Sequence, residues 1–111
     1  MAGKFELYKD KAGEFRFGLK AGNGENILAS EGYKDKGGVE NGIASVRKNA
    51  ADKDRFEVKE STSGKHYFVL KAANHQVIGQ SQMYDAKSNA ENGIESVMNN
   101  APEASLDDQA D

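Results

Sequence analysis

The apolar residues at the start of the chain recur with a period of two. Residues 5–8 and 15–20 both alternate between apolar and polar side chains. This pattern is typical of strands that bury one face and expose the other. The dipeptide Asn23-Gly24 between apolar segments favours a tight hairpin with positive φ at both central residues. A third strand is therefore expected over residues 27–30.

The period then changes to that of a helix. Val39, Ile43, Val46 and Ala50 lie at spacings of four, three and four residues, which places them in one stripe of a helix. Gly42 adjoins this stripe, although glycine costs about 1 kcal/mol relative to alanine inside a helix. We therefore expect the missing side chain to allow close packing against a neighbouring element.

The sequence contains an internal repeat of this pattern. A shift of 51 residues aligns residues 5–50 with residues 56–101 without a gap, and 20 of the 46 pairs are identical. The repeat includes the phrase "ENGI.SV" in the middle of each helix. In the second copy Ser88 and Glu91 have the spacing of a capping box, which predicts the start of that helix.

The duplication predicts the fold class. We expect an α+β protein in which two tandem β-β-β-α repeats, residues 3–50 and 54–101, form one mainly antiparallel sheet with two helices packed on one face. Neither copy is expected to bury its own apolar face, so residues 1–101 should form a single domain. The expected state is a monomer with internal pseudo-two-fold symmetry. Residues 102–111 are expected to be an acidic, disordered tail.

Composition and charge narrow the functional classes. The net charge is −3, and the four acids of residues 102–111 account for it, since 15 basic residues then face 18 − 4 = 14 acidic ones. A near-neutral body lacks the electrostatic footprint of a duplex-binding protein. The chain has no cysteine and no apolar run long enough for a signal or a membrane span. We expect a cytoplasmic protein without membrane contact.

Candidate chemistry is sparse. His66 and His75 are the only histidines and have no metal-ligand spacing. Ser30 and Ser81 occur in both copies but outside a nucleophile elbow. Glycine pairs such as Gly37-Gly38 match no phosphate-binding motif. We therefore predict no enzyme activity, no metal and no cofactor.

A family resemblance adds to this interpretation. The repeated pattern "LKA.N...I..S..Y..K" followed by "GI.SV", and the phrase "KAANHQVIGQSQMY" at residues 71–84, resemble the YegP-like family of small bacterial proteins. The resemblance covers residues 3–101. It implies a tandem β-β-β-α unit that forms one sheet, which single-unit relatives achieve by dimerising. It also makes "ASLDD" at residues 104–108 a candidate for an additional strand. The family has no established activity, so no catalytic residue follows from it.

The remaining candidate is a contact surface. If the helices cover one face of the sheet, the other face carries aromatic and basic residues, and a turn with Asn is repeated in the two units. The predicted contact surface is either this exposed sheet face or the two symmetric turn regions. We predict a non-enzymatic binding or protein-interaction module for a protein or small ligand, with a single-stranded nucleic-acid binder as the alternative and an enzyme least favoured. A solvated sheet face and turn-forming asparagines would explain the same residues without a function. The predicted contact residues are Tyr8, Arg16, Lys20, Asn23, Lys59, Tyr67, Lys71 and Asn74.

Overall fold

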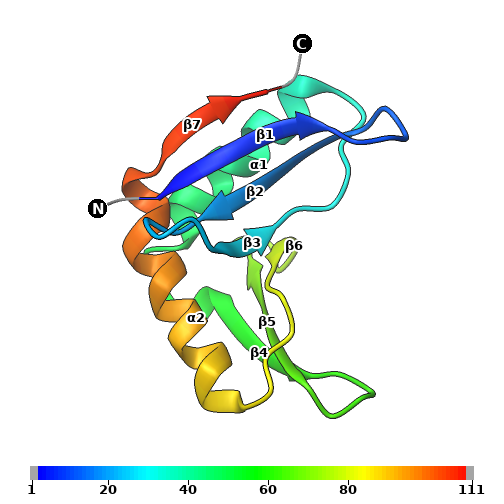
Figure 1. The fold of residues 1–111 in the computed structure, drawn as a ribbon. Coiled ribbons are helices and arrows are strands. Elements are labelled where there is room, and N and C mark those ends of the chain that lie inside the picture. Colours follow the sequence, from blue (N-terminus) through cyan, green and yellow to red (C-terminus); the bar gives the residue numbers. More distant parts are fainter. Residues whose placement is uncertain (1–2, 110–111) are drawn as a thin grey trace.

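Two β-β-β-α units succeed one another in the computed structural model, which describes residues 3–109 (Figure 1). The first unit and the short helix after it are β1 (Lys4–Lys9), β2 (Phe15–Lys20), β3 (Asn26–Ala29), α1 (Lys36–Asn49) and η1 (Lys53–Arg55). The second unit consists of β4 (Phe56–Glu60), β5 (His66–Lys71), β6 (Val77–Gln80) and α2 (Lys87–Asn100). A short helix η2 (Ala101–Glu103) and a last strand β7 (Ser105–Asp108) come after α2. The element order matches the repeat found in the sequence.

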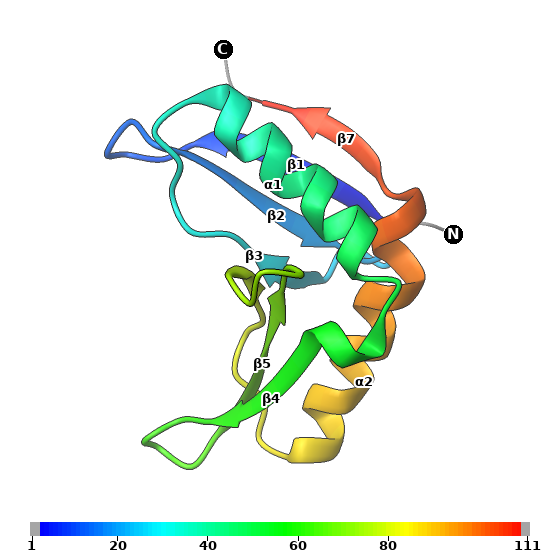
Figure 2. The same cartoon turned by 180° about the vertical axis from the view of Figure 1, so that it is seen from behind.

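All the strands belong to one sheet in the order β4-β5-β6-β3-β2-β1-β7. Every neighbouring pair is antiparallel except β1 and β7, which are parallel. The second unit runs outward from the middle of the sheet as β6, β5 and β4, and the first unit runs outward in the other direction as β3, β2 and β1. The two units therefore meet at β3 and β6 and are related by a pseudo-two-fold axis. Both helices lie on one face of this sheet (Figures 1 and 2). The expected fold class is confirmed.

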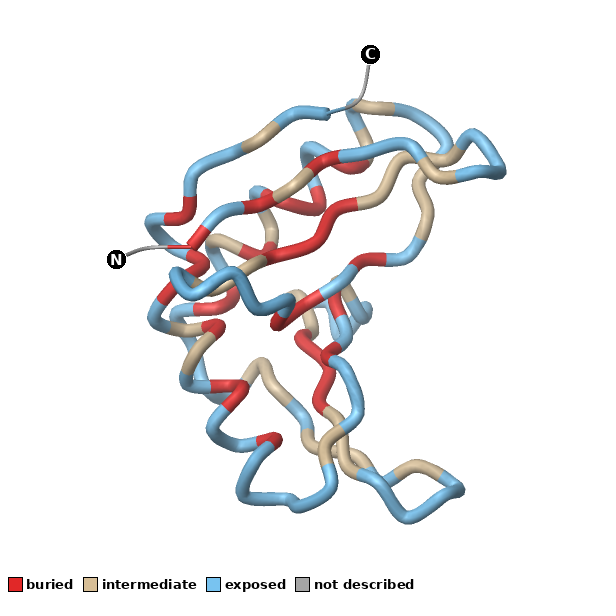
Figure 3. Tube along the Cα trace, viewed as in Figure 1, coloured by how far each residue is buried: buried red, intermediate tan, exposed pale blue. Residues whose placement is uncertain are grey.

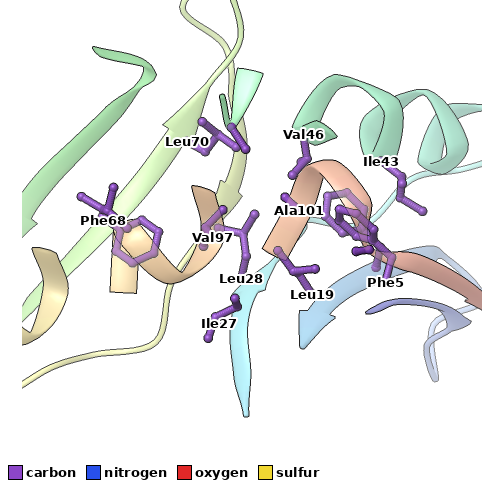
Figure 4. Close-up of a cluster of buried hydrophobic side chains, with 14 of the residues drawn as sticks. Phe5, Leu19, Ile27, Leu28, Ile43, Val46, Phe68, Leu70, Val97 and Ala101 are labelled. Carbon is purple, nitrogen blue, oxygen red and sulfur yellow. The ribbon is translucent and has the colours of Figure 1, made fainter. Parts of the chain in front are cut away.

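The two units share their interior. α1 contacts β5 and β6 of the second unit as well as β2 of its own, and α2 contacts β3 as well as β4 and β5. Buried residues lie along the middle of the strands and one stripe of each helix (Figure 3). Figure 4 shows Leu28 of the first unit near Val97 of the second, and both belong to one buried cluster with Leu70. The predicted stripe of α1 is buried along its whole length, and its counterpart in α2 is buried as well.

The glycines inside the helices make room for tyrosine rings. A Cβ on Gly42 would lie 2.6 Å from the hydroxyl oxygen of Tyr33, and a Cβ on Gly93 would lie 2.6 Å from that of Tyr84. The same Cβ atoms would also crowd Phe17 and Phe68 of the sheet. The expected close packing is confirmed, with the tyrosine ring as the main neighbour.

The predicted capping box of the second helix is wrong. Asp35 caps α1 by accepting a hydrogen bond from the Gly38 amide at 2.7 Å, whereas α2 begins at Lys87 after Ala86 without a side-chain cap. Ser88 therefore lies inside the first turn, because the bridge between Tyr84 and His66 already fixes the extended chain that leads into the helix.

The hairpin turn after β2 also differs from its prediction. Of the described non-glycine residues only His75 has positive φ, so Asn23 does not, and Gly24 alone adopts it, at 86°. The Gly24 amide donates to the Ala21 carbonyl and the Ala21 amide donates to the Glu25 carbonyl. The turn is thus a three-residue loop with glycine in the left-handed position, not a two-residue primed turn.

The expected disordered tail is wrong for most of its length. Residues 105–108 form β7, which lies parallel to β1 along its outer edge. Backbone hydrogen bonds to β1 and two lysines far away in the sequence hold the strand there. The acidic composition of residues 102–111 gives no indication of these distant partners, so it predicted disorder. "ASLDD" thus includes the additional strand, while residues 110–111 of the predicted tail lie outside the described residues.

Candidate functional site

The predicted contact residues of the strands lie together on the face of the sheet away from the helices. We call this the open face. Tyr8 on β1 lies opposite Arg16 on β2, and Lys59 on β4 lies opposite Tyr67 on β5. Lys20 and Lys71 occupy equivalent positions at the ends of β2 and β5. The residues that alternate with them along β2 and β5, such as Phe17 and Phe68, point to the core, as the alternation predicted.

Carboxylates accompany the cations of the open face in the first unit. The Arg16 guanidinium donates through Nε to Asp10 Oδ2 at 2.7 Å and through Nη1 to the Ser30 carbonyl at 3.3 Å. The hydrogen bond from Arg16 holds the pKa of the Asp10 carboxyl below its usual value, and the same bond raises the pKa of Arg16. Lys20 Nζ lies 3.2 Å from Glu6 Oε1.

The second unit repeats part of this arrangement. Lys71 Nζ lies 2.5 Å from Glu57 Oε1, which is the equivalent of the Lys20–Glu6 pair. The hydrogen bond from Lys71 lowers the pKa of Glu57, and the charge of Lys59 acts in the same direction. The open face is therefore a surface of paired charges with two exposed or half-exposed tyrosines, rather than a cationic surface.

The open face is hollowed where the two units meet. β3 and β6 pair through Ala29 and Gln80 alone, so the sheet opens on both sides of this pair. One hollow has a volume of about 360 Å³ and the other about 180 Å³. Both include Ala29, Gln80 and Ser81 in their walls, and Arg16, Ser30 and Glu31 add to the larger. We call the larger hollow the seam groove.

Sequence reasoning missed the seam groove. Its walls come from β2 and β3 of one unit and from β6 of the other, and the pairing of β3 with β6 is not indicated by the sequence pattern. The apolar side is formed by Val77 and Ile78, and the exposed fraction of Val77 is 44%. The one sequence signal for the groove is that two of its wall segments, residues 29–31 and 77–81, contain the repeated serines Ser30 and Ser81.

The two repeated serines have structural roles. Ser30 Oγ accepts from the Phe17 amide at 2.9 Å and donates to the Glu31 carbonyl at 2.8 Å. Ser81 repeats this with the Phe68 amide at 2.9 Å and the Gln82 carbonyl at 2.8 Å. Each hydroxyl uses its proton on a backbone carbonyl, so it serves the sheet and not a general base.

The two turn asparagines lie in the loops that follow β2 and β5. Asn23 Oδ1 accepts from the Glu25 amide and Asn74 Oδ1 accepts from the Gln76 amide, at 3.0 and 3.1 Å. Asn23 also lines a separate hollow of about 280 Å³ against α2, together with Tyr84, Asn92 and Ser96. The contact surface predicted from the sequence is thus divided between the open face and the turn regions.

The two histidines lie at strand ends and turns. His66 pairs with Tyr84 through backbone hydrogen bonds at the start of β5, and His75 occupies the turn after β5 with φ of 69°. Over residues 3–109 no three side chains of the metal-ligating types gather in one place. Within that same part of the chain, neither long helix combines the length and the apolar character that a bilayer span requires.

Solved structures of similar proteins have the same fold. The solution NMR structure of yegP from Escherichia coli, a protein of unknown function, superposes with a TM-score of 0.93 at 53% identity, covering 99% of this chain and 95% of that one. The solution NMR structure of a UPF0339 protein from Shewanella oneidensis gives a TM-score of 0.92 at 47% identity, covering 99% and 93%.

Sequence relatives agree with the structural ones. A UPF0339 protein encoded in the 5′ region of the ptx operon of Stutzerimonas stutzeri is 59% identical over 96% of both chains, and one from Pseudomonas aeruginosa is 54% identical over 99% of this chain and all of that one. The model of the domain of unknown function DUF1508 matches residues 10–57 and again residues 61–108, with starts 61 − 10 = 51 residues apart, as the internal repeat requires. The chain therefore belongs to the DUF1508 family, carries two copies of its domain, and is similar to YegP over nearly its whole length.

Proposed function

We propose that the chain is a non-enzymatic binding module and that its ligand lies across the open face, centred on the seam groove. The observation that carries this proposal is the groove itself. It is a hollow of about 360 Å³ at the meeting point of the two units, on the face that neither helix covers. Pockets that form between structural units are common ligand sites.

Arg16 gives the seam groove its chemical preference. Within residues 3–109, its hydrogen bonds use Nε and one proton of Nη1. A guanidinium has five N–H donors, so three remain for a ligand. Asp10 holds the side chain in place without covering the groove wall. We infer that the ligand places a carboxylate or another hydrogen-bond acceptor at Arg16 and an apolar group at Val77.

Single-stranded nucleic acid is the less favoured ligand. Binding to phosphates requires cations that are free to exchange counterions. On the open face Arg16, Lys20 and Lys71 each lie within ion-pair distance of a carboxylate. A protein segment or a small polar molecule fits this balanced charge better.

The proposal is tested by capture from a cell lysate with immobilised protein. The full-length chain is compared with Arg16→Ala and Gln80→Ala, and with Lys11→Ala as a control on the exposed hairpin. We expect a ligand retained by the wild type and the control and lost from both groove variants. Equal retention by all four proteins would contradict the proposal. Retention of oligonucleotides that weakens as salt rises would favour the nucleic-acid alternative.

A further inference from the structure

At the β1 end of the sheet the protein binds an acidic strand of its own, β7. β7 lies parallel to β1, with the Ser105 amide donating to the Gly3 carbonyl at 3.2 Å and the Gln109 amide donating to the Leu7 carbonyl at 2.7 Å. β7 comes after α2 and reaches β1 from the other end of the chain (Figure 1). The outer edge of β1 is thus an acceptor for a parallel strand.

Two successive aspartates of β7 form ion pairs with two different lysines. Asp107 Oδ2 lies 3.6 Å from Lys4 Nζ at the start of β1. Asp108 Oδ2 lies 2.6 Å from Lys36 Nζ at the start of α1. Successive residues of a strand point to opposite faces of the sheet. A cation on each side of the acceptor edge therefore recognises a pair of neighbouring acids.

The other end of the sheet has an equivalent edge, on β4, to which no further strand is added within residues 3–109. β4 is the last strand at that end, and across residues 3–109 no strand pairs with its outer side. Val58 lies opposite Phe68, whose backbone N–H and C=O are both used on the other side by Ser81. Val58 must therefore turn its own N–H and C=O outward, as Leu7 does in β1.

The two cations recur at this vacant edge. The 51-residue shift places Arg55 where Lys4 lies and Lys87 where Lys36 lies. Lys87 is exposed, and Arg55 is half-buried with its Nε 3.7 Å from Asp52, a distance that leaves it available to a closer partner. The outward backbone groups of β4, Arg55 beside that strand and Lys87 on α2 thus match three parts of the acceptor that β7 occupies on β1. The fourth part differs, because Met98 replaces Arg47, whose Nη1 donates to the Ala104 carbonyl at 2.6 Å.

We propose that the outer edge of β4, with Arg55 and Lys87, binds an extended acidic segment of a partner protein by parallel strand addition. The segment carries two successive acidic residues, as β7 does. Main-chain hydrogen bonds supply the affinity and the two cations select the acids. This site is on a strand edge and is independent of the seam groove, so either can fail without the other.

The test uses the full-length chain and a synthetic peptide with the sequence of residues 102–109. Binding is measured by amide chemical shifts of the protein and by fluorescence anisotropy of a labelled peptide. We expect shifts in residues 55–60 and binding that weakens with salt. Exchange of both peptide aspartates for asparagine, or the double variant Arg55→Glu with Lys87→Glu, should weaken binding by about tenfold. The matched control Lys11→Glu should leave it unchanged.

Three results would overturn the proposal. The first is an absence of shifts at millimolar peptide. The second is a set of shifts confined to β1, which would mean that the peptide replaces β7 and leaves β4 vacant. The third is a dimer in the absence of peptide whose interface perturbs β4, because the edge would then accept a second copy of this chain rather than an acidic partner.

Discussion

The two units have the same strands and the same helix, yet they bury equivalent residues to different extents. Phe5 and Leu7 of β1 are fully buried, whereas Phe56 and Val58 of β4 are half-buried. β7 and the Arg47 side chain cover the first pair, with the Arg47 guanidinium 5.0 Å from the centre of the Phe5 ring. Among residues 3–109, no strand covers the equivalent edge of β4, and Met98 stands where Arg47 does. The duplication produced two equivalent strand edges, on β1 and β4, and β7 pairs with the edge of β1.

The units also differ at the seam. Leu28 on β3 corresponds to Gly79 on β6, and a Cβ on Gly79 would lie 2.8 Å from Leu28 Cγ. On the opposite face Gly18 corresponds to Val69. Next to a two-fold axis, two large residues at the same position would compete for one space. The duplicated chain resolves this by making one of the two a glycine, which an assembly of two identical units cannot do.

The largest effect is expected from restoring symmetry at the seam. Gly79→Leu with Leu28 unchanged should lower the free energy of unfolding by about 3 kcal/mol, because the core there has no space for a second leucine. The double exchange Leu28→Gly with Gly79→Leu should recover most of this loss. Urea unfolding measures both. A double variant no more stable than Gly79→Leu would show that the two positions do not share one space.

Removal of β7 should make the two ends of the sheet alike. A chain that stops after Ala101 exposes Phe5 and Leu7 and should lose about 2 kcal/mol of unfolding free energy. Amide hydrogen exchange should accelerate more at β1 than at β4. Equal exchange in the two chain lengths would contradict the role given to β7.

The helix glycines test a feature in which the units agree. Gly93→Ala gains about 1 kcal/mol of helix propensity but pushes against the Tyr84 ring, so the net expected loss is about 1.5 kcal/mol. The loss should shrink in a Tyr84→Phe background, since the hydroxyl is the nearest atom. Gly42→Ala should behave in the same way. Thermal unfolding of these variants and the parent chain is sufficient, and a gain in stability from Gly93→Ala would refute the packing.

The two hairpin turns have different residues at the left-handed position. His75 adopts φ of 69° where Gly24 has 86°. A left-handed conformation costs a residue with a side chain about 1 kcal/mol, so His75→Gly should raise the stability by that amount and Gly24→His should lower it. Equal melting temperatures for the three proteins would contradict this interpretation of the turns.

The smallest effect concerns one ion pair without a counterpart. The second unit has Ser61 and Tyr67 where the first has Asp10 and Arg16. Because the pKa of Asp10 is lowered in the folded chain, its stabilising contribution is present above the usual carboxyl pKa of about 4 and is lost as the pH falls through the lower folded value. Arg16→Ala should raise the pKa of Asp10 towards its usual value, as a carboxyl NMR titration would detect. An unchanged Asp10 pKa would contradict the assignment.

Periodicity predicts the strands and the helices because these depend on local patterns, and the repeat predicts that the two units share one sheet without giving the strands through which they meet. The strand β7 could not be predicted from composition, since its acids are stabilised by Lys4 and Lys36 about 70 or more residues away in the sequence. The predicted start of α2 is wrong because tertiary pairing at Tyr84 outweighs the local signal of Ser88. The strand residues of the candidate surface do lie on one face, but the seam groove depends on the pairing of β3 with β6, which no pattern indicates.

If the two units share one interior, the N-terminal unit alone cannot cover its helix stripe and its strands. The most direct measurement is the thermal unfolding of residues 1–51 by circular dichroism at several concentrations, with the mass determined by sedimentation. We predict no cooperative transition for the monomeric fragment and recovery of one when residues 52–111 are added. A fragment that remains monomeric and melts cooperatively, independently of concentration, would contradict a shared interior.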